Sequence, residues 1–329
     1  MKSTTALLAS MTGLIVLAGC AQQNPVANSN TDPAATYASA AGVSTEIQTM
    51  PDEFEFSTYE DGSEAKADMS DPSFVAVKGS ATIDAAIDPA IWFRLIRSHE
   101  RRFVVEFEHP DSMTVLANVK IVDRLLGTFN VVTKPDTIDG SITSRQWIKK
   151  PLADRAVRKA VFVRHRIVSD DAVSENEDRE DGFRDGWSRW RLTAISGVEI
   201  TSDDGTRQIN SVRLQTNGGV DLTVTDPLAL IRRPDLTRIP PSTRVHVTAT
   251  TSDPTDVVVL YSRWGRMRLT PTAPGVWEGG FLTPAEGGLR HVAVNALSHG
   301  TLFEDNGPYD SKAWGVPFVV GPDAVAAQP

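Results

Sequence analysis

The sequence predicts a mainly β protein in which an α+β domain is followed by a β-sandwich. Three observations support this prediction. Short segments rich in β-branched and aromatic residues recur over residues 103–320, with turn residues between them. One helical pattern precedes these segments, at residues 89–100. The β-rich segments over residues 235–322 have the spacing that is typical of a sandwich.

We expect residues 1–19 to be an export signal. Lys2 gives this segment a positive start, and the apolar stretch that follows ends at Leu17. The stretch is shorter than the ~20 residues that a membrane-spanning helix needs, and its length is typical of the apolar part of a signal peptide. The signal ends in Leu17-Ala18-Gly19-Cys20, which resembles the lipobox of bacterial lipoproteins at all four positions. The alternatives are an ordinary secretory signal with a coincidental cysteine, or a short buried helix.

The lipobox resemblance implies that Cys20 is the lipid attachment site. In this family the cysteine thiol receives a diacylglyceryl group, a peptidase cuts before the cysteine, and the new amino group is acylated, commonly with palmitate. Several acyl chains together hold a protein on a bilayer, where a single chain is marginal. Cys20 is the only cysteine, so no intramolecular disulfide forms. Ala21 stands where an Asp tends to retain similar lipoproteins at the inner membrane. We therefore expect the outer membrane, with either its periplasmic or its outer face as the location.

The acidic balance of the chain limits its partners. The formal net charge is −9, and no stretch gives the broad basic footprint of a nucleic-acid-binding protein. The same charge disfavours electrostatic adhesion to anionic lipid headgroups, so the expected membrane contact is covalent, through acylated Cys20. A protein or a glycan is the candidate partner beyond the bilayer. Residues 20–72 are rich in small polar residues without a sustained period, which predicts a lipidated N-terminus followed by a flexible tether.

Residues 73–234 are predicted to form the α+β domain. Asp88-Pro89 is typical of a helix start, because Asp caps a helix and Pro fits its first position. Residues at helical spacing then predict a helix over 89–100: Trp92, Leu95, Ile96 and His99. Later β-rich segments include a pair around Asn217-Gly218-Gly219, a strong hairpin signal. A helix lying across a curved antiparallel sheet resembles the nuclear-transport-factor-2-like and cystatin-like folds.

Residues 235–322 are predicted to form the sandwich, and residues 323–329 a tail. Ile239-Pro240-Pro241 makes a stiff start, and buried and exposed positions alternate from Arg244 to Ala249. Gly275-Val276-Trp277-Glu278-Gly279 and the segment 288–296 resemble the penultimate strands of immunoglobulin-like or fibronectin-type modules. The sequence departs from antibody domains because the cysteine pair is missing. Arg290 also stands where many modules place a corner tyrosine.

No sequence motif assigns catalytic, cofactor-binding or metal-binding residues. His99-Glu100-Arg101-Arg102-Phe103 begins like a zinc-protease helix motif, but Phe103 replaces the second histidine that zinc needs. The acidic stretch 170–185 lacks the order of a calcium loop, which favours a solvated loop. The loop 304–307, followed by Asp310, is an alternative Ca²⁺ site, although Asp-Asn-Gly also favours a turn. The tryptophans allow a carbohydrate platform, but their positions within strands favour core packing.

These observations lead to one hypothesis on function and two alternatives. The first is a membrane-anchored lipoprotein with a non-enzymatic binding or scaffold role at the cell envelope. The alternative is a ligand-binding or catalytic domain at 73–234, with a pocket between the helix and the sheet. Its polar candidates are His99, Asp123 and His165. The third is a purely structural envelope component in which both domains are spacers.

Overall fold

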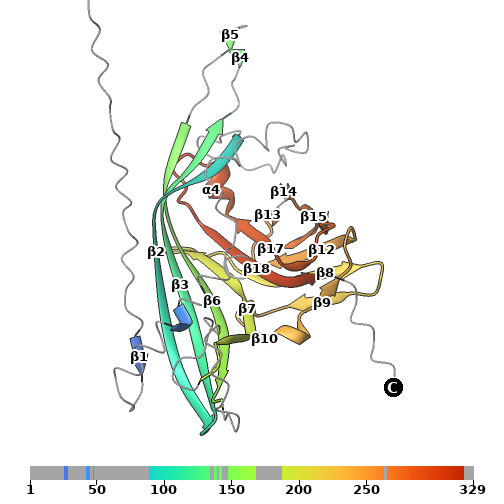
Figure 1. The fold of residues 1–329 in the computed structure, drawn as a ribbon. Coiled ribbons are helices and arrows are strands. Elements are labelled where there is room, and N and C mark those ends of the chain that lie inside the picture. Colours follow the sequence, from blue (N-terminus) through green and yellow to red (C-terminus); the bar gives the residue numbers. More distant parts are fainter. Residues whose placement is uncertain are drawn as a thin grey trace, which may run out of the picture.

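The computed structural model describes residues 26–28, 42–44, 47, 89–133, 137–138, 141–142, 147–167, 187–262 and 265–321 (Figure 1). Several predictions therefore lie outside the described residues. They are the signal 1–19 with Cys20, most of the tether 20–72, the acidic stretch 170–185 and the tail 323–329.

The described part is mainly β, with two antiparallel sheets and almost no helix. The longest helix, α4 (His299–Phe303), has 5 residues. The predicted helix over 89–100 is wrong, because these residues belong to strand β2 (Pro89–Asp111). Pro89 begins this strand, a position where a proline without an N–H is tolerated. Pairing with the neighbouring strand β3 overrides the local helical spacing, so no main helix lies on a sheet and the predicted α+β arrangement is also wrong.

The larger sheet has 11 strands. Its main path runs in the order β1-β2-β3-β6-β7-β18-β17-β13-β14, and short strands add to β7 and β18. The strands not yet given are β1 (Val26–Asn28), β3 (Thr114–Thr133), β6 (Trp147–His165), β7 (Arg191–Ser202), β18 (Ser311–Val320), β17 (Gly288–Leu297), β13 (Val257–Ser262), β14 (Gly265–Arg268), β10 (Ile231–Arg232) and β11 (Arg238–Ile239). A separate two-stranded ladder joins β4 (Thr137–Ile138) to β5 (Ser141–Ile142). Figure 1 shows β2, β3 and β6 as long curved strands beside the rest of the molecule.

The second sheet has five strands in the order β15-β16-β12-β8-β9. They are β15 (Thr270–Ala273), β16 (Val276–Leu282), β12 (Arg244–Thr251), β8 (Ile209–Thr216) and β9 (Asp221–Val224). The predicted hairpin around Gly219 is confirmed, since β8 pairs with β9 and Gly219 has φ 94°. β8 and β9 precede residue 234 yet share a sheet with β12, so the predicted boundary falls inside a continuous sheet.

Strands β13, β17 and β18 form a middle layer that is buried on both faces. On β17, Val292 and Val294 belong to a core shared with the five-stranded sheet. Ala293 and Leu297 of the same strand belong to a second core, shared with Phe129 of β3. This double burial explains the nearly continuous apolar runs of these strands, because both faces are buried over most of their length.

Alternate residues of β3 from Val115 to Ile121 form a further apolar cluster beneath the long strands, together with Phe162 and Trp190. Val43 and Ile47 are buried in this same cluster, so these described residues of the predicted tether pack against the sheet. A small additional cluster contains Ala156 of β6 and Ile200 of β7.

Candidate functional site

Asp123 is the centre of a polar cluster on the inner face of the long strands. Its carboxylate is buried, and it accepts hydrogen bonds from His99 Nε2 (2.9 Å), Arg101 Nε (2.6 Å) and one terminal nitrogen of Arg158 (3.1 Å). The strand register brings these residues together. Arg101 of β2 lies directly opposite Asp123, and His99 is two residues away on the same face. Arg158 is placed in the same way from β6, two residues from the position opposite Asp123.

The electrostatics of this cluster keep Asp123 ionised. Burial raises the pKa of the Asp123 carboxyl, but hydrogen bonds from His99 and Arg101 and the charge of Arg158 outweigh it, so the pKa falls to about 2. His291 of β17 is close to Arg158. Burial lowers the pKa of His291 to about 3, and the charge of Arg158 adds to this effect, so His291 is neutral near pH 7.

This arrangement orients the His99 imidazole but offers few of the groups that catalysis needs. An aspartate with a pKa of about 2 and three side-chain donors neither gives nor takes a proton near neutral pH. The His99 side chain is 45% exposed, and within the described ranges it receives no hydrogen bond from a hydroxyl nucleophile. The third candidate, His165, lies elsewhere, with its Nδ1 3.3 Å from Thr114 Oγ1 at the end of the β3–β6 ladder. The structure thus joins two of the three predicted residues.

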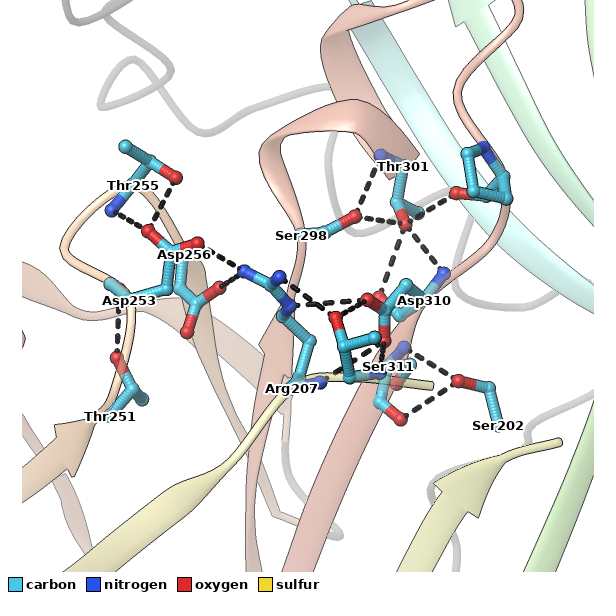
Figure 2. Close-up of polar contacts among 12 residues, drawn as sticks. Ser202, Arg207, Thr251, Asp253, Thr255, Asp256, Ser298, Thr301, Asp310 and Ser311 are labelled. Carbon is cyan, nitrogen blue, oxygen red and sulfur yellow. Dashed lines mark hydrogen bonds and ion pairs between the residues drawn. The ribbon is translucent and has the colours of Figure 1, made fainter. Parts of the chain in front are cut away.

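Arg207 is the centre of a second cluster, which joins the two sheets (Figure 2). It follows β7 and precedes β8. Its Nε lies 3.1 Å from Asp310, and one terminal nitrogen lies 2.5 Å from Asp253 and 3.0 Å from Asp256. Thr206 adds hydrogen bonds to Asp310 from its backbone N–H (3.0 Å) and its hydroxyl (2.8 Å). The guanidinium is therefore the cation that balances the charges of these three carboxylates.

The charges of this second cluster support one another. Burial lowers the pKa of Arg207, but the hydrogen bonds that it donates to Asp253 and Asp256 raise it more, so the guanidinium stays charged. The backbone N–H and hydroxyl of Thr255 lower the pKa of Asp253 to about 2. Burial raises the pKa of Asp256 above its ordinary value despite the bonds from Arg207.

The acidic loop before β18 forms a turn. The Gly307 N–H donates to the Glu304 carbonyl (3.3 Å), which is the bond expected of the Asp-Asn-Gly sequence. Asp310, the other oxygen donor of the alternative Ca²⁺ site, binds Arg207 and Thr206 instead. Across the residues that the structure describes, no group of three or more His, Cys, Asp or Glu side chains is placed to hold a metal ion.

A third cluster lies between the long strands and the middle layer. Arg94 of β2 donates to the Tyr309 hydroxyl (3.0 Å) and to Ser311 Oγ (3.2 Å). The Tyr309 hydroxyl in turn donates to Asp154 of β6 (2.9 Å), and Ser311 donates to Asn295 of β17 (2.8 Å). All five side chains are buried. Burial raises the pKa of Tyr309, so the phenol stays protonated and keeps its donor role.

Lys150 ties the long strands to the helix α4 and the loop after it. Its ammonium donates to the carbonyls of Gly300 (2.7 Å) and Glu304 (2.6 Å). Burial lowers the pKa of Lys150 to about 8, although the charges of Glu304 and Asp305 partly oppose this shift. The cation therefore acts on backbone groups of a neighbouring segment.

Sequence reasoning missed Arg94, Asp154, Lys150, Arg207 and Tyr309, which carry most of these contacts. One signal was available for Arg94, because it shares a face with Trp92 once the segment is treated as a strand. The partners of Arg207 and Lys150 are far away in the sequence, so no local pattern indicates them.

Comparison of the chain with models of protein families, with curated proteins and with solved structures finds no match. No helix in the described part of the chain has the length and hydropathy to cross a membrane. The arguments on function below therefore come from the residues and their contacts.

Proposed function

We propose that this protein is a lipoprotein of the outer membrane with a non-enzymatic binding or scaffold role at the cell envelope. One observation carries the non-enzymatic part. In each of the three clusters, which centre on Asp123, Arg207 and Arg94, the charged groups contact partners within their own cluster. They join separate strands rather than facing an open site. Such networks fix the positions of layers, which is what a rigid presenting surface needs.

The length of the sheet supports a scaffold role. β2 has 23 residues, which corresponds to roughly 75 Å at the usual rise of an extended strand. Its pairing with β3, and of β3 with β6, continues along almost the whole of these strands. The resulting surface holds its ends far apart, so it has room for more than one partner along its length.

We infer further that the two stacked sheets are an immunoglobulin-like module. Trp277 and Trp314 belong to their common core, and β12 of the five-stranded sheet alternates between core and outer positions. The loops and edges of such modules commonly bind partners, and we propose a protein or a glycan as the partner here. This inference rests on analogy between folds.

The lipid anchor rests on Leu17-Ala18-Gly19-Cys20 and is tested by labelling. The full chain is expressed in a Gram-negative host that is fed an alkynyl palmitate analogue. We expect label on the wild type and none on Cys20→Ser. Gln22→Asn, two residues away, serves as the matched control and should keep the label. An unlabelled wild type would contradict the anchor.

The outer-membrane location is tested by one further variant. Ala21→Asp introduces the residue that retains similar lipoproteins at the inner membrane. We expect this variant to keep its acyl label and to move to the inner-membrane fraction of a sucrose gradient. Ala21→Ser, which adds no charge, should stay in the outer-membrane fraction. A wild type already in the inner-membrane fraction would contradict the proposal.

A catalytic role is the second candidate, and the hydrogen bond between His99 and Asp123 is the observation that favours it. The test is a broad panel of hydrolase substrates, applied to the full chain and to His99→Gln. The non-enzymatic proposal expects no turnover by either protein. Turnover by the wild type that is lost in His99→Gln would replace it with the catalytic one.

A further inference from the structure

A cavity of about 330 Å³ lies where β11 and the turn before it meet β17 and β18. Its walls come from segments that are far apart in the sequence. The lining residues are Arg233, Pro234, Leu236, Arg238, Gly288, Leu289 and Val319. The volume is at the lower end of the range of small-molecule sites, ~300–1,000 Å³.

The lining combines an apolar floor with cations. Leu236, Leu289 and Val319 belong to or pack against the apolar cluster beneath the long strands, so the floor continues the core of the protein. Arg233 and Arg238 line the same cavity and carry positive charges. A site with an apolar wall and guanidinium groups fits a molecule with an apolar tail and an anionic head.

Arg238 lines the cavity, and Arg290 directly follows the lining residue Leu289. Neither arginine forms an ion pair with a carboxylate in the described ranges. The Arg290 guanidinium donates instead to the carbonyls of Leu289 (2.9 Å) and Gly287 (3.1 Å). In a chain with a net charge of −9, this leaves a local excess of positive charge at the cavity. The excess attracts an anion.

The backbone around the cavity is held in place. β11 pairs with β18, which places Arg238 opposite Val319. Gly288 has φ 129°, a conformation that side chains rarely adopt, and a Cβ on it would lie 3.2 Å from the Arg290 guanidinium. The glycine therefore lets the arginine fold back over the start of β17. The site is preorganised rather than assembled by the ligand.

We propose that this cavity binds a small amphipathic anion, a molecule with one carboxylate or phosphate head and a short alkyl chain. The head contacts Arg238 and Arg233, and the chain lies on Leu236, Leu289 and Val319. The site goes beyond the proposed function and does not depend on the lipid anchor.

The test uses residues 20–329 with Cys20→Ser, expressed without the export signal so that no detergent is needed, and decanoate as the probe in isothermal titration calorimetry. We expect saturable binding with one molecule per chain. Arg238→Gln should weaken decanoate binding roughly tenfold, the effect of losing a charge-assisted hydrogen bond. Arg244→Gln, which removes an exposed arginine of β12, is the matched control and should bind like the parent.

Ligand variants separate the two parts of the site. Shortening decanoate to octanoate should weaken binding about tenfold, because each buried CH₂ contributes ~0.8 kcal/mol. Decanol, which lacks the charge, should bind no more tightly than decanoate does to Arg238→Gln. Decyl phosphate, compared with decanoate, identifies the preferred head. The proposal is overturned if decanoate does not bind at millimolar concentration, or if decanol equals decanoate, or if Arg238→Gln binds like the parent.

Discussion

His99 and Asp123 lie on neighbouring strands with a 2.9 Å hydrogen bond between the imidazole Nε2 and the carboxylate. The two residues are on β2 and β3, and Arg158 of β6 completes the contact on the other side. The Asp123 carboxylate thus links three long strands, and this contact contributes to the free energy of folding.

Asp123→Asn should remove part of the pH dependence of stability in acid. The pKa of Asp123 is about 2 in the folded protein and 3.8 without perturbation, so the folded state favours the carboxylate. Its contribution is fully present above pH 3.8 and is lost as the pH falls from 3.8 to about 2. The difference corresponds to roughly 2 kcal/mol. Urea unfolding at several pH values measures it, and an identical acid dependence in the variant would contradict the assignment.

Arg207→Met should destabilise the protein by roughly 2–4 kcal/mol, because three carboxylates lose their common cation. The loss should fall short of that for a fully buried ion, since the Asp253 side chain is 34% exposed. Arg213→Met is the control, because it removes an arginine that pairs with Asp221 at the surface. We expect a much smaller loss there. Equal losses in the free energy of unfolding would mean that Arg207 does not hold the two sheets together.

Tyr309→Phe should cost about 1–3 kcal/mol, because Arg94 and Asp154 both lose a buried partner. Tyr261→Phe is the matched control. Its hydroxyl is also buried but has no hydrogen-bond partner among the described residues. Removing that hydroxyl should leave the stability unchanged or raise it. Similar losses in both variants during urea unfolding would show that ring packing, and not the hydroxyl, matters at Tyr309.

The sequence predicts the mainly β class and the β8–β9 hairpin, because alternation and turn residues are local signals. The sequence-based prediction fails at residues 89–100. Their apolar residues have helical spacing, but they pair with β3, which lies later in the chain, and no local pattern shows this pairing. For the candidate site, the sequence offers His99 and Asp123 only as polar candidates for a pocket between the predicted helix and the sheet. Arg158 is not among them, because its place beside Asp123 depends on the register between β3 and β6.

Lys150→Met should flatten the stability profile between pH 8 and pH 10.5. The pKa of Lys150 is about 8 in the folded protein and 10.5 without perturbation, so the folded state disfavours the ammonium. Between these values the unfolded chain binds more protons, and the contribution of Lys150 to stability therefore rises with pH. Lys149→Met, which removes the exposed neighbour, should keep this rise. If thermal or urea unfolding shows the same rise in Lys150→Met, the ammonium is not buried against the carbonyls of Gly300 and Glu304.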